Sequence, residues 1–462
     1  MIRLTIGKAA AIVGGKRRGE DAVFRGVSLD TRSIRKGELF VAIKGQRHDG
    51  HVFVRAAAEA GAAGAMVVDE SAVPAGMPAI VVGDTRLGLL ALAAFYRAGL
   101  GVQVAAITGS NGKTTTKELL GRLLSIKYRA RWAPESYNND IGVPLTVFSL
   151  SPEDEAAVFE IEMNQSGGTL ALARVCRPKV GVITNVHDTH LEFMHDRAGV
   201  AAEKAELLQT LPPDGVVVLN GDDEMVSAIG HRSGVRQQLW FGLNRARDVF
   251  AAELSDRGID GVSFRLNDRY PVRLRLAGVH NVSNCLAACA AAAAMGIDFA
   301  AMPEVLERFE APQLRLRVRK LRGMVMIEDC YNANPQSVRA GLDVLRQSGS
   351  KGNRVAILGD MLELGAKAES LHLEIGMLAA GVCDRLGLVG GLASRIADGA
   401  ISAGLAADRV CQWPSAKQVG PELFDLLHIG DTILVKGSRA MGLESLVKMI
   451  ASHYGEDTDQ IH

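Results

Sequence analysis

The sequence predicts an α/β fold with largely parallel sheets, divided into three segments. Apolar β-rich runs alternate with Ala- and Leu-rich helical stretches along almost the whole chain, as they do in α/β units. A length of 462 residues is long for one domain and suits two to four. One strand in the middle of the chain leads through a glycine-rich loop into a helix, an arrangement that binds phosphate.

The balance of charged residues argues against several classes of partner. The chain has 52 Lys and Arg against 52 Asp and Glu, so no net field draws it to nucleic acid or an anionic membrane. Its 6 cysteines include no CxxC pair, which suits a reducing compartment. No run reaches the ~18 apolar residues of a membrane span, and the first residues lack the long apolar stretch and cleavage site that are typical of a signal peptide. We therefore expect a cytoplasmic protein with no nucleic-acid partner and no membrane span.

Two breaks in the pattern divide the chain. A predicted helix at residues 87–98 is separated by glycine from the strand at residues 104–108. A basic alternating run at residues 314–322 precedes a new strand at residues 324–329. The predicted segments are residues 1–100, 101–318 and 319–462.

Two stretches depart from this parallel α/β pattern. Between residues 249 and 276, apolar and polar residues alternate around turn signals, which predicts small antiparallel strands attached to the parallel core. The polar tail from Gly455 is expected to fray.

The glycine-rich loop predicts a triphosphate site. It has the short TGxxGKT form, with Ile107 at the first glycine position of the standard motif. Backbone N–H groups of such a loop face phosphate oxygens, and the helix that follows adds a favourable dipole. We expect Lys113 against the β- and γ-phosphates and Thr114 or Thr115 at Mg²⁺; a glycine turn that binds nothing is the weaker interpretation. The predicted loop residues are Gly109, Ser110, Asn111, Gly112, Lys113, Thr114 and Thr115.

Polar side chains at the ends of two further strands are candidates for a metal site. Glu160 and Glu162 lie near the C-terminal end of a predicted strand, where ligands gather in parallel sheets, and alternate residues share a face. A carboxylate beside a phosphate loop suits Mg²⁺, although one glutamate there is equally consistent with an exposed charge. His190 follows the next strand and can reach a metal or phosphate; the alternative is a cap or surface histidine.

At three other places in the chain, the spacing of the residues leaves two interpretations of their role open. Lys204 lies between two glutamates in a helical stretch, and a solvated lysine is the simpler interpretation. Residues 220–223 form a polar turn or a substrate contact. Asn281 and Asn284 are three apart on one helical face, which suits the edge of a base, or else they are helix caps.

Taken in order, these motifs resemble the Mur ligases, and the resemblance covers nearly the whole chain. The strings YNANP at residues 331–335 and LGDMLELG at residues 358–365 are the most specific. They are most similar to the members that add D-alanyl-D-alanine to a UDP-N-acetylmuramoyl tripeptide, whereas the phosphate loop indicates only the wider family. Further matching strings are Asp30-Thr31-Arg32, residues 40–53, Asn138-Asn139, His280-Asn281 and residues 435–439.

The resemblance implies an activity and a separate role for each of the three domains. It implies a UDP-precursor-binding domain, a central P-loop-type ATPase domain with a mainly parallel sheet, and a Rossmann-like C-terminal domain that brings the amine. ATP and two Mg²⁺ ions would convert the carboxylate of UDP-MurNAc-tripeptide to an acyl phosphate, which D-Ala-D-Ala would attack. The product would be the pentapeptide precursor of peptidoglycan. The tripeptide would end in diaminopimelate or lysine, and the protein is expected to be a monomer.

The same resemblance assigns roles to individual residues. Lys204 matches a lysine that reacts with CO₂, and the resulting carbamate would turn a cation into an oxygen ligand for Mg²⁺; this replaces the solvated interpretation. Asn281, Arg315 and Asp329 match positions that hold adenine, phosphate and ribose. The implied catalytic residues are Lys113, Glu160, His190 and Lys204, and the implied metal ligands are Thr114, Glu160, His190 and Lys204. The implied substrate-binding residues are Asp30, Thr31, Arg32, Lys44, Gly45, His48, Asn138, Asn139, Tyr331, Asn332, Asn334, Lys436, Ser438 and Arg439.

Four positions depart from the usual pattern of the family. Glu162 and Leu314 stand where glycine is usual, Gly168 where glutamate is usual, and Gly442 where arginine is common. These changes bear on the metal site and the amine pocket rather than on the fold. We hypothesise that Glu162 supplies a compensating carboxylate to the metal.

Three alternatives have less support. The ligase that adds the third residue carries a DNPR-type string in its diaminopimelate-selecting members, where this chain has NANP. Folylpolyglutamate synthase shares the phosphate loop but is not expected to carry YNANP. A catalytically weakened Mur-like scaffold that binds nucleotide and precursor is favoured only by the departures at Glu162 and Gly168, and the four retained catalytic positions argue against it.

Overall fold

The computed structural model describes residues 1–45 and 48–456. Gln46 and Arg47, which belong to the matching string at residues 40–53, lie outside the described residues, as does the part of the predicted frayed tail beyond residue 456. Within the described residues, no helix is both long enough and apolar enough to cross a bilayer.

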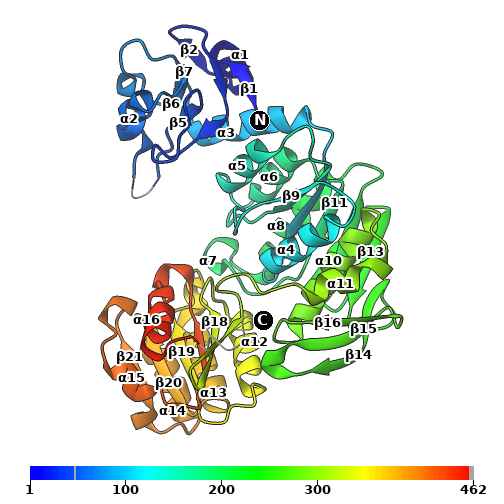
Figure 1. Ribbon diagram of the computed structural model, residues 1–462, viewed down its shortest axis with the longest axis vertical. Helices are drawn as coiled ribbons and strands as arrows, with labels where there is room; N and C mark the ends of the chain where they lie inside the picture. The colour runs from blue at the N-terminus through cyan, green and yellow to red at the C-terminus, as the bar shows by residue number, and fades with distance from the viewer. Residues whose placement is uncertain (46–47, 457–462) are drawn as a thin grey trace.

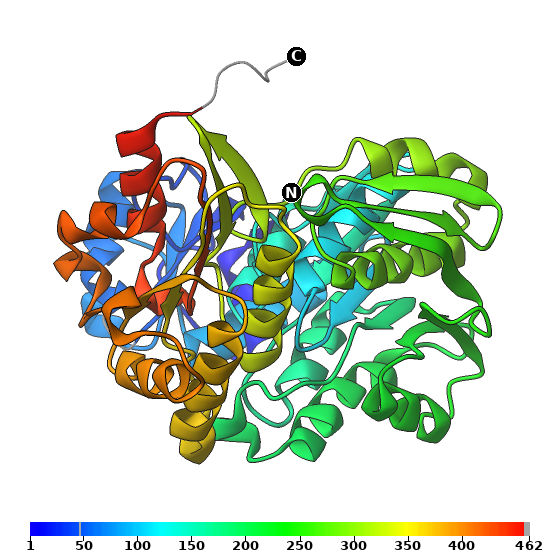
Figure 2. The same ribbon diagram turned by 90° about the horizontal axis from the view of Figure 1, so that it is seen from below.

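The described chain forms three domains, each built on a mainly parallel sheet. The N-terminal domain stands at one end of the molecule, and the central and C-terminal domains lie side by side (Figures 1 and 2). Helices cover the sheets because their strands are apolar on both faces, which favours burial from both sides. The predicted α/β class with three domains is confirmed.

The N-terminal domain has a five-stranded sheet in the order β2-β7-β6-β5-β4, parallel except at the edge strand β2. Helix α3 begins two residues before the predicted helix because the side chain of Asp84 caps the N–H groups of Arg86 and Leu87. The elements are β1 (Arg3–Thr5), α1 (Ile6–Val13), β2 (Lys16–Arg18), β3 (Val23–Arg25), β4 (Val27–Ser28), β5 (Leu39–Val41), α2 (Val54–Glu59), β6 (Gly64–Val67), β7 (Ala79–Val81) and α3 (Thr85–Ala98).

The central domain has a nine-stranded sheet in the order β16-β15-β14-β13-β12-β11-β8-β10-β9. Strands β14, β15 and β16 pair antiparallel, as the alternation at residues 249–276 predicts. Strand β8 lies between β11 and β10, so the loop that follows it is flanked by the carboxyl ends of both neighbours. The elements are β8 (Gln103–Thr108), α4 (Lys113–Leu124), β9 (Ala130–Trp132), α5 (Gly142–Ser149), β10 (Ala156–Glu160), α6 (Gly168–Cys176), β11 (Val180–Ile183), α7 (Leu191–Met194), α8 (Arg197–Ala205), β12 (Val216–Asn220), α9 (Glu224–Arg232), β13 (Gln237–Gly242), β14 (Val249–Asp256), β15 (Val262–Leu266), β16 (Tyr270–Leu274), α10 (His280–Ala294) and α11 (Met302–Glu307).

The C-terminal domain has a six-stranded sheet in the order β17-β18-β22-β19-β20-β21. All neighbours are parallel except β17, which pairs antiparallel with β18. The elements are β17 (Arg317–Leu321), β18 (Met324–Asp329), α12 (Pro335–Arg346), β19 (Arg354–Gly359), α13 (Ala368–Ala380), β20 (Arg385–Val389), α14 (Ala393–Ser402), β21 (Val410–Trp413), α15 (Glu422–Leu426), β22 (Thr432–Lys436) and α16 (Glu444–Tyr454).

The N-terminal and central domains share one hydrophobic core. Helix α3 packs against α1 on one side and against α5 and α6 on the other, and a continuous cluster of buried residues runs through all four helices. The guanidinium of Arg97, at the end of α3, is buried and donates to the carbonyl oxygens of Leu100 (2.9 Å), Val102 (2.7 Å) and Cys176 (2.9 Å). The junction between these two domains is therefore packed rather than a free linker.

Candidate active site

The loop between β8 and α4 depends on two glycines. Gly109 has φ +145° and Gly112 has φ +81°, conformations that L-residues rarely adopt. A Cβ at Gly109 would lie 1.9 Å from Oγ1 of Thr184, and one at Gly112 would lie 2.0 Å from Oδ1 of Asn284. Neighbouring polar groups therefore approach the backbone at both positions, and only glycine fits there.

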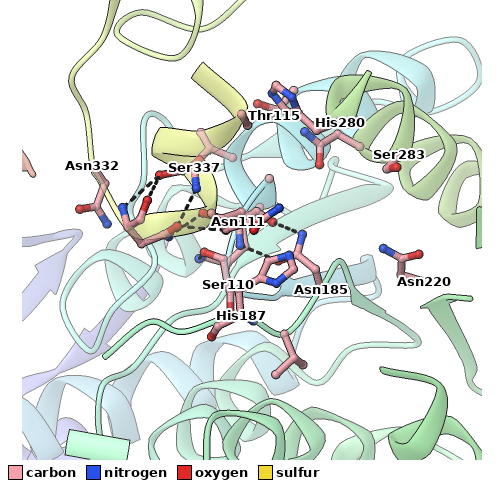
Figure 3. Close-up of a pocket in the computed structure, with 18 of the residues that line it drawn as sticks. Ser110, Asn111, Thr115, Asn185, His187, Asn220, His280, Ser283, Asn332 and Ser337 are labelled. Atoms are coloured by element: carbon pink, nitrogen blue, oxygen red, sulfur yellow. Dashed lines mark hydrogen bonds between the residues drawn. The ribbon is translucent and has the colours of Figure 1, made fainter. Parts of the chain in front are cut away.

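The end of strand β11 holds this loop in place. The N–H of Ser110 donates to the carbonyl of Asn185 (3.0 Å), and the N–H of Asn111 donates to the side-chain oxygen of Asn185 (2.8 Å). The hydroxyl of Thr184 donates to the carbonyl of Asn111 (2.7 Å), and the N–H of His187 donates to the Ser110 hydroxyl (2.8 Å). Figure 3 shows Asn185 and His187 beside Ser110 and Asn111. Hydrogen bonds to the residues that follow β11 therefore fix the conformation of the loop.

Lys113 begins a chain of charged groups that crosses from the central to the C-terminal domain. Its Nζ lies 2.6 Å from Oε1 of Glu162, whose same oxygen lies 3.2 Å from Nε2 of His190. Nδ1 of His190 lies 2.5 Å from Oε2 of Glu363, just beyond β19. Although burial acts to raise the pKa of Glu162, Lys113 and His190 hold it well below its usual range. Burial acts to lower the pKa of His190, but the two glutamates raise it to about 9.

Oxygen atoms that could coordinate a magnesium ion lie beside the loop. The hydroxyl of Thr114 donates to Oε2 of Glu160 (2.8 Å), and Nδ2 of Asn138 donates to Glu160 (2.8 Å) and to Glu162 (3.1 Å). Glu160 is buried, so the interpretation of an exposed charge is wrong for this residue. Among the described residues, no group of three or more His, Cys, Asp or Glu side chains could by itself hold a metal. Magnesium usually takes one or two carboxylates and completes its shell with phosphate oxygens and water, and this donor set agrees with that habit.

Lys204 is buried in α8, with 1% of its surface exposed, so the solvated interpretation is wrong. Its Nζ lies 3.3 Å from Oε2 of Glu203. Burial lowers the pKa of Lys204, although Glu203 opposes the shift, and the charges of Lys113 and Glu162 are close enough to act on it. A lowered pKa increases the neutral amine fraction, the form that reacts with electrophiles.

The first residues of helix α10 form another wall of the site. Nδ2 of Asn281 donates to the carbonyl of Ala277 (2.9 Å), and Nδ2 of Asn284 donates to Oδ1 of Asn281 (2.9 Å). Neither side chain caps α10, whose N-cap is Val279, so the interpretation as caps is wrong. Burial, assisted by the charge of Lys436, lowers the pKa of His280 to about 4.

The C-terminal domain contributes a second set of polar groups. Nδ2 of Asn334 donates to Oδ1 of Asn111 in the phosphate loop (2.7 Å), and Lys436 pairs with Asp329 (2.6 Å) and donates to the carbonyl of Asn332 (3.1 Å). Burial raises the pKa of Asp329, although Lys436 opposes the shift.

Two arginines flank the ring of Tyr331. The guanidinium of Arg315 lies 4.1 Å from the ring centroid and that of Arg439 lies 5.7 Å from it. Arg315 also donates to the hydroxyl of Ser136 (3.0 Å), which lies 3.0 Å from the hydroxyl of Thr114. Positive charge from the C-terminal half therefore reaches the phosphate loop.

A cavity of about 590 Å³ lies between the central and C-terminal domains and is lined by polar groups from both. Figure 3 shows the loop residue Asn111 beside Asn332 and Ser337, with His280 and Ser283 on the helix above and Asn220 to one side. Of residues 220–223, predicted to be a polar turn or a substrate contact, Asn220, Asp222 and Asp223 line this cavity. Of the residues predicted for nucleotide or amine binding, the cavity is lined by Ser110, Asn111, Gly112, Lys113, Thr114, Thr115, Asn281, Arg315, Asp329, Tyr331, Asn332, Asn334 and Lys436.

The remaining predicted residues lie elsewhere. Asn139 accepts hydrogen bonds from the N–H groups of Ile141 and Gly142, and Ser438 accepts one from that of Leu362. Arg439 lines a second cavity of about 540 Å³, which also includes Thr114, Arg315 and Tyr331. In the N-terminal domain, which lies at the opposite end of the molecule from the C-terminal domain in Figure 1, Arg32 pairs with Asp30 and the N–H of Gly45 donates to the carbonyl of His48. The residues of that domain that line neither cavity are Asp30, Thr31, Arg32, Lys44, Gly45 and His48.

Several contacts were not predicted from the sequence. Lys117 is fully buried and donates to the carbonyls of Ala133 and Glu135, which fixes the segment that carries Ser136 and Asn138. The sequence feature that could have drawn attention to Lys117 is its position one helical turn after Lys113. Glu363 lies in the LGDMLELG string, but nothing local in that string indicates its contact with His190.

The comparisons with known proteins agree with this arrangement. Family models match residues 23–97 (Mur ligase family, catalytic domain), 107–292 (Mur ligase middle domain) and 313–439 (Mur ligase, glutamate ligase domain). Relatives from several bacteria carry the name UDP-N-acetylmuramoyl-tripeptide--D-alanyl-D-alanine ligase, and two of them illustrate the similarity. The one from Bacillus subtilis is 34% identical over 97% of this chain and 98% of its own, and the one from Escherichia coli is 34% identical over 97% and 99%.

A solved structure gives the same result for the whole fold. The crystal structure of MurF from Acinetobacter baumannii has a TM-score of 0.88 and 30% identity, and the match covers 98% of this chain and 99% of that one. Domain order, phosphate loop and sequence relatives all lead to one conclusion: the chain belongs to the Mur ligase family.

Proposed function

We propose that this chain ligates D-alanyl-D-alanine to UDP-N-acetylmuramoyl-tripeptide with conversion of ATP to ADP and phosphate, which yields the pentapeptide precursor of peptidoglycan. The single observation that supports this most is the cavity in which the phosphate loop meets the NANP string through the contact between Asn111 and Asn334. That contact joins the nucleotide-binding residues to a string similar to those of ligases that use this dipeptide.

In this proposal ATP lies along the cavity. Asn281 and His280 face the base, Asp329 holds the ribose, and Lys113 with the loop N–H groups holds the β- and γ-phosphates. Thr114, Glu160 and His190 would hold Mg²⁺, which when bound would offset negative charge on the phosphates.

The reaction proceeds in two steps. A carboxylate oxygen of the tripeptide attacks the γ-phosphorus and ADP leaves, giving an acyl phosphate. The dipeptide amine then attacks the acyl carbon, the C–O bond to phosphate breaks, and the amine loses a proton. Lys113 and Arg315 lie where negative charge builds on the transferred group, and the arginines that flank Tyr331 suit the carboxylate of the incoming dipeptide.

Lys204 is proposed to act as a carbamate that holds a second Mg²⁺. Its burial and lowered pKa support this role, because only the neutral amine adds CO₂. The full-length protein equilibrated with ¹³C-bicarbonate should give a carbamate signal in ¹³C NMR that is absent from Lys204→Arg. A signal of equal size in both proteins would contradict the proposal.

The N-terminal domain is proposed to bind the UDP part of the precursor through Asp30, Thr31, Arg32, Lys44, Gly45 and His48. We propose domain limits at residues 1–100, 101–318 and 319–462 and a monomeric protein. The family models leave residues 98–106 and 293–312 unmatched; the first range contains the boundary proposed at 100–101, whereas the second ends shortly before the one proposed at 318–319, which falls within strand β17.

Phosphate release from ATP tests the proposed reaction. It is measured with UDP-MurNAc-tripeptide, with and without D-Ala-D-Ala, for both the diaminopimelate and the lysine tripeptide, and mass spectrometry identifies the product. Release that requires both substrates and yields pentapeptide is expected. Nucleotide and precursor binding without product would favour the scaffold instead.

A further inference from the structure

The ammonium of Lys113 has three protons and three acceptors within the protein. It donates to the carbonyl oxygens of Gly109 (2.7 Å) and Ser110 (3.3 Å) and to Oε1 of Glu162 (2.6 Å). The Lys113 side chain is only 7% exposed, so water does not compete freely for these bonds. A phosphate that binds Lys113 must therefore replace one of the three acceptors.

Glu162 is the acceptor that can move. The two carbonyls belong to a loop fixed by Thr184 and Asn185, whereas Glu162 lies beyond the end of β10 and carries rotatable bonds. Its carboxylate also accepts from Asn138 (3.1 Å) and lies 3.2 Å from Nε2 of His190. Glu162 can therefore leave Lys113 and still keep two partners.

We infer that Glu162 is a positioning residue that competes with nucleotide phosphate for Lys113 and so sets the affinity of the site for nucleotides with a β-phosphate. The inference rests on the proposed function only in placing nucleotide at the phosphate loop. It differs from the hypothesis that Glu162 is a metal ligand, because a metal ligand would strengthen the binding of the metal–nucleotide complex, whereas a competitor weakens binding even without metal.

The competition is measured as nucleotide affinity of the full-length protein by isothermal titration calorimetry in EDTA, and the titrations are repeated with Mg²⁺. Glu162→Gln keeps the shape of the side chain but removes the charge that holds Lys113. It should bind ADP about tenfold more tightly than the natural protein, the effect expected of a charge-assisted hydrogen bond. AMP, which lacks the β-phosphate, should bind equally to both. Glu162→Gly, which restores the residue usual in the family, should act in the same direction and serves as a second variant if the first does not fold.

Glu224→Gln is the matched control. Glu224 lines the same cavity and is exposed, and in the described part of the chain no hydrogen bond or ion pair joins its carboxylate to Lys113, so the variant removes one negative charge without freeing the lysine. It should leave ADP affinity unchanged.

Several results would overturn the inference. These are an unchanged or weaker ADP affinity in both Glu162 variants, equal tightening for AMP, an equal effect of Glu224→Gln, or a loss of affinity that appears only with Mg²⁺, which would make Glu162 a metal ligand. If the natural protein binds no nucleotide at all, the proposed function fails together with the inference. Nucleotide binding that is insensitive to both Glu162 variants overturns the inference alone.

Discussion

At Gly112 the backbone is left-handed, with φ +81°, and an added Cβ would lie 2.0 Å from Oδ1 of Asn284. Gly112→Ala should therefore lose at least tenfold in ADP affinity, because either the loop or Asn284 must shift; the backbone conformation alone costs about 1–2 kcal/mol. Gly76→Ala is the control, since Gly76 has φ +80° and open space around it. Titration with ADP and chemical denaturation of both variants separate the two effects. Equal ADP affinity in the two variants would contradict the steric argument.

His280 should make stability depend on pH. Its pKa is about 4 in the folded protein against an ordinary value of 6.5, so the unfolded chain binds a proton there first. The stabilisation is present above about pH 6.5 and is lost as the pH falls toward 4. Between pH 7.5 and 5, the free energy of unfolding should fall by about 2 kcal/mol more in the natural protein than in His280→Asn. Parallel urea titrations at the two pH values measure this, and equal losses would show that His280 is not responsible.

Single residues also show which features could not be predicted from the sequence. Lys204 lies between glutamates, a pattern of solvated helical faces, and only the resemblance to a family indicated another role. Its burial comes from the packing of α8 within the folded domain, and spacing along one helix carries no information about that. The pair of Lys113 and Glu162 joins residues 49 apart in sequence, so it could not be predicted from local pattern.

At the scale of elements, the residue that caps helix α12 also forms a hydrogen bond with the phosphate loop. Asn334 caps α12 in a capping box with Ser337, and its amide also bonds Asn111. Asn334→Ala should cost about 1 kcal/mol as a lost cap and should in addition weaken ADP binding several-fold. Ser337→Ala disturbs the same capping box without removing the bond to Asn111, so it should lose stability but keep ADP affinity. A similar loss of affinity in both variants would mean that the cap, rather than the interdomain bond, matters.

Helices and strands could be predicted where the signal lies within their own stretch of the sequence. The strand of the phosphate loop, the helix that ends at residue 98 and the antiparallel strands of residues 249–276 all appear close to where alternation and turn signals put them. Strand β10 ends at Glu160, however, so Glu162 is not on the strand as predicted. The two carboxylates still meet, because Asn138 from another segment bonds both.

At the scale of the whole molecule, the order of three domains could be predicted, but their packing could not. Apolar periodicity indicates that α3 has a buried face without indicating which domain covers it. The structure shows that α3 is covered from both sides, and that the buried Arg97 ties its end to the central domain.

The shared core around α3 has a thermodynamic consequence. Residues that are buried in one continuous cluster gain and lose their order together, so the first two domains should behave as one cooperative unit on heating. Differential scanning calorimetry of the full chain should then resolve at most two transitions, one for the N-terminal and central domains and one for the C-terminal domain. Arg97→Ala, which removes the donor from three carbonyls through two buried hydrogen bonds and one partly buried one, should lower the temperature of the larger transition. Three separate transitions would mean that the first two domains melt independently despite the core they share.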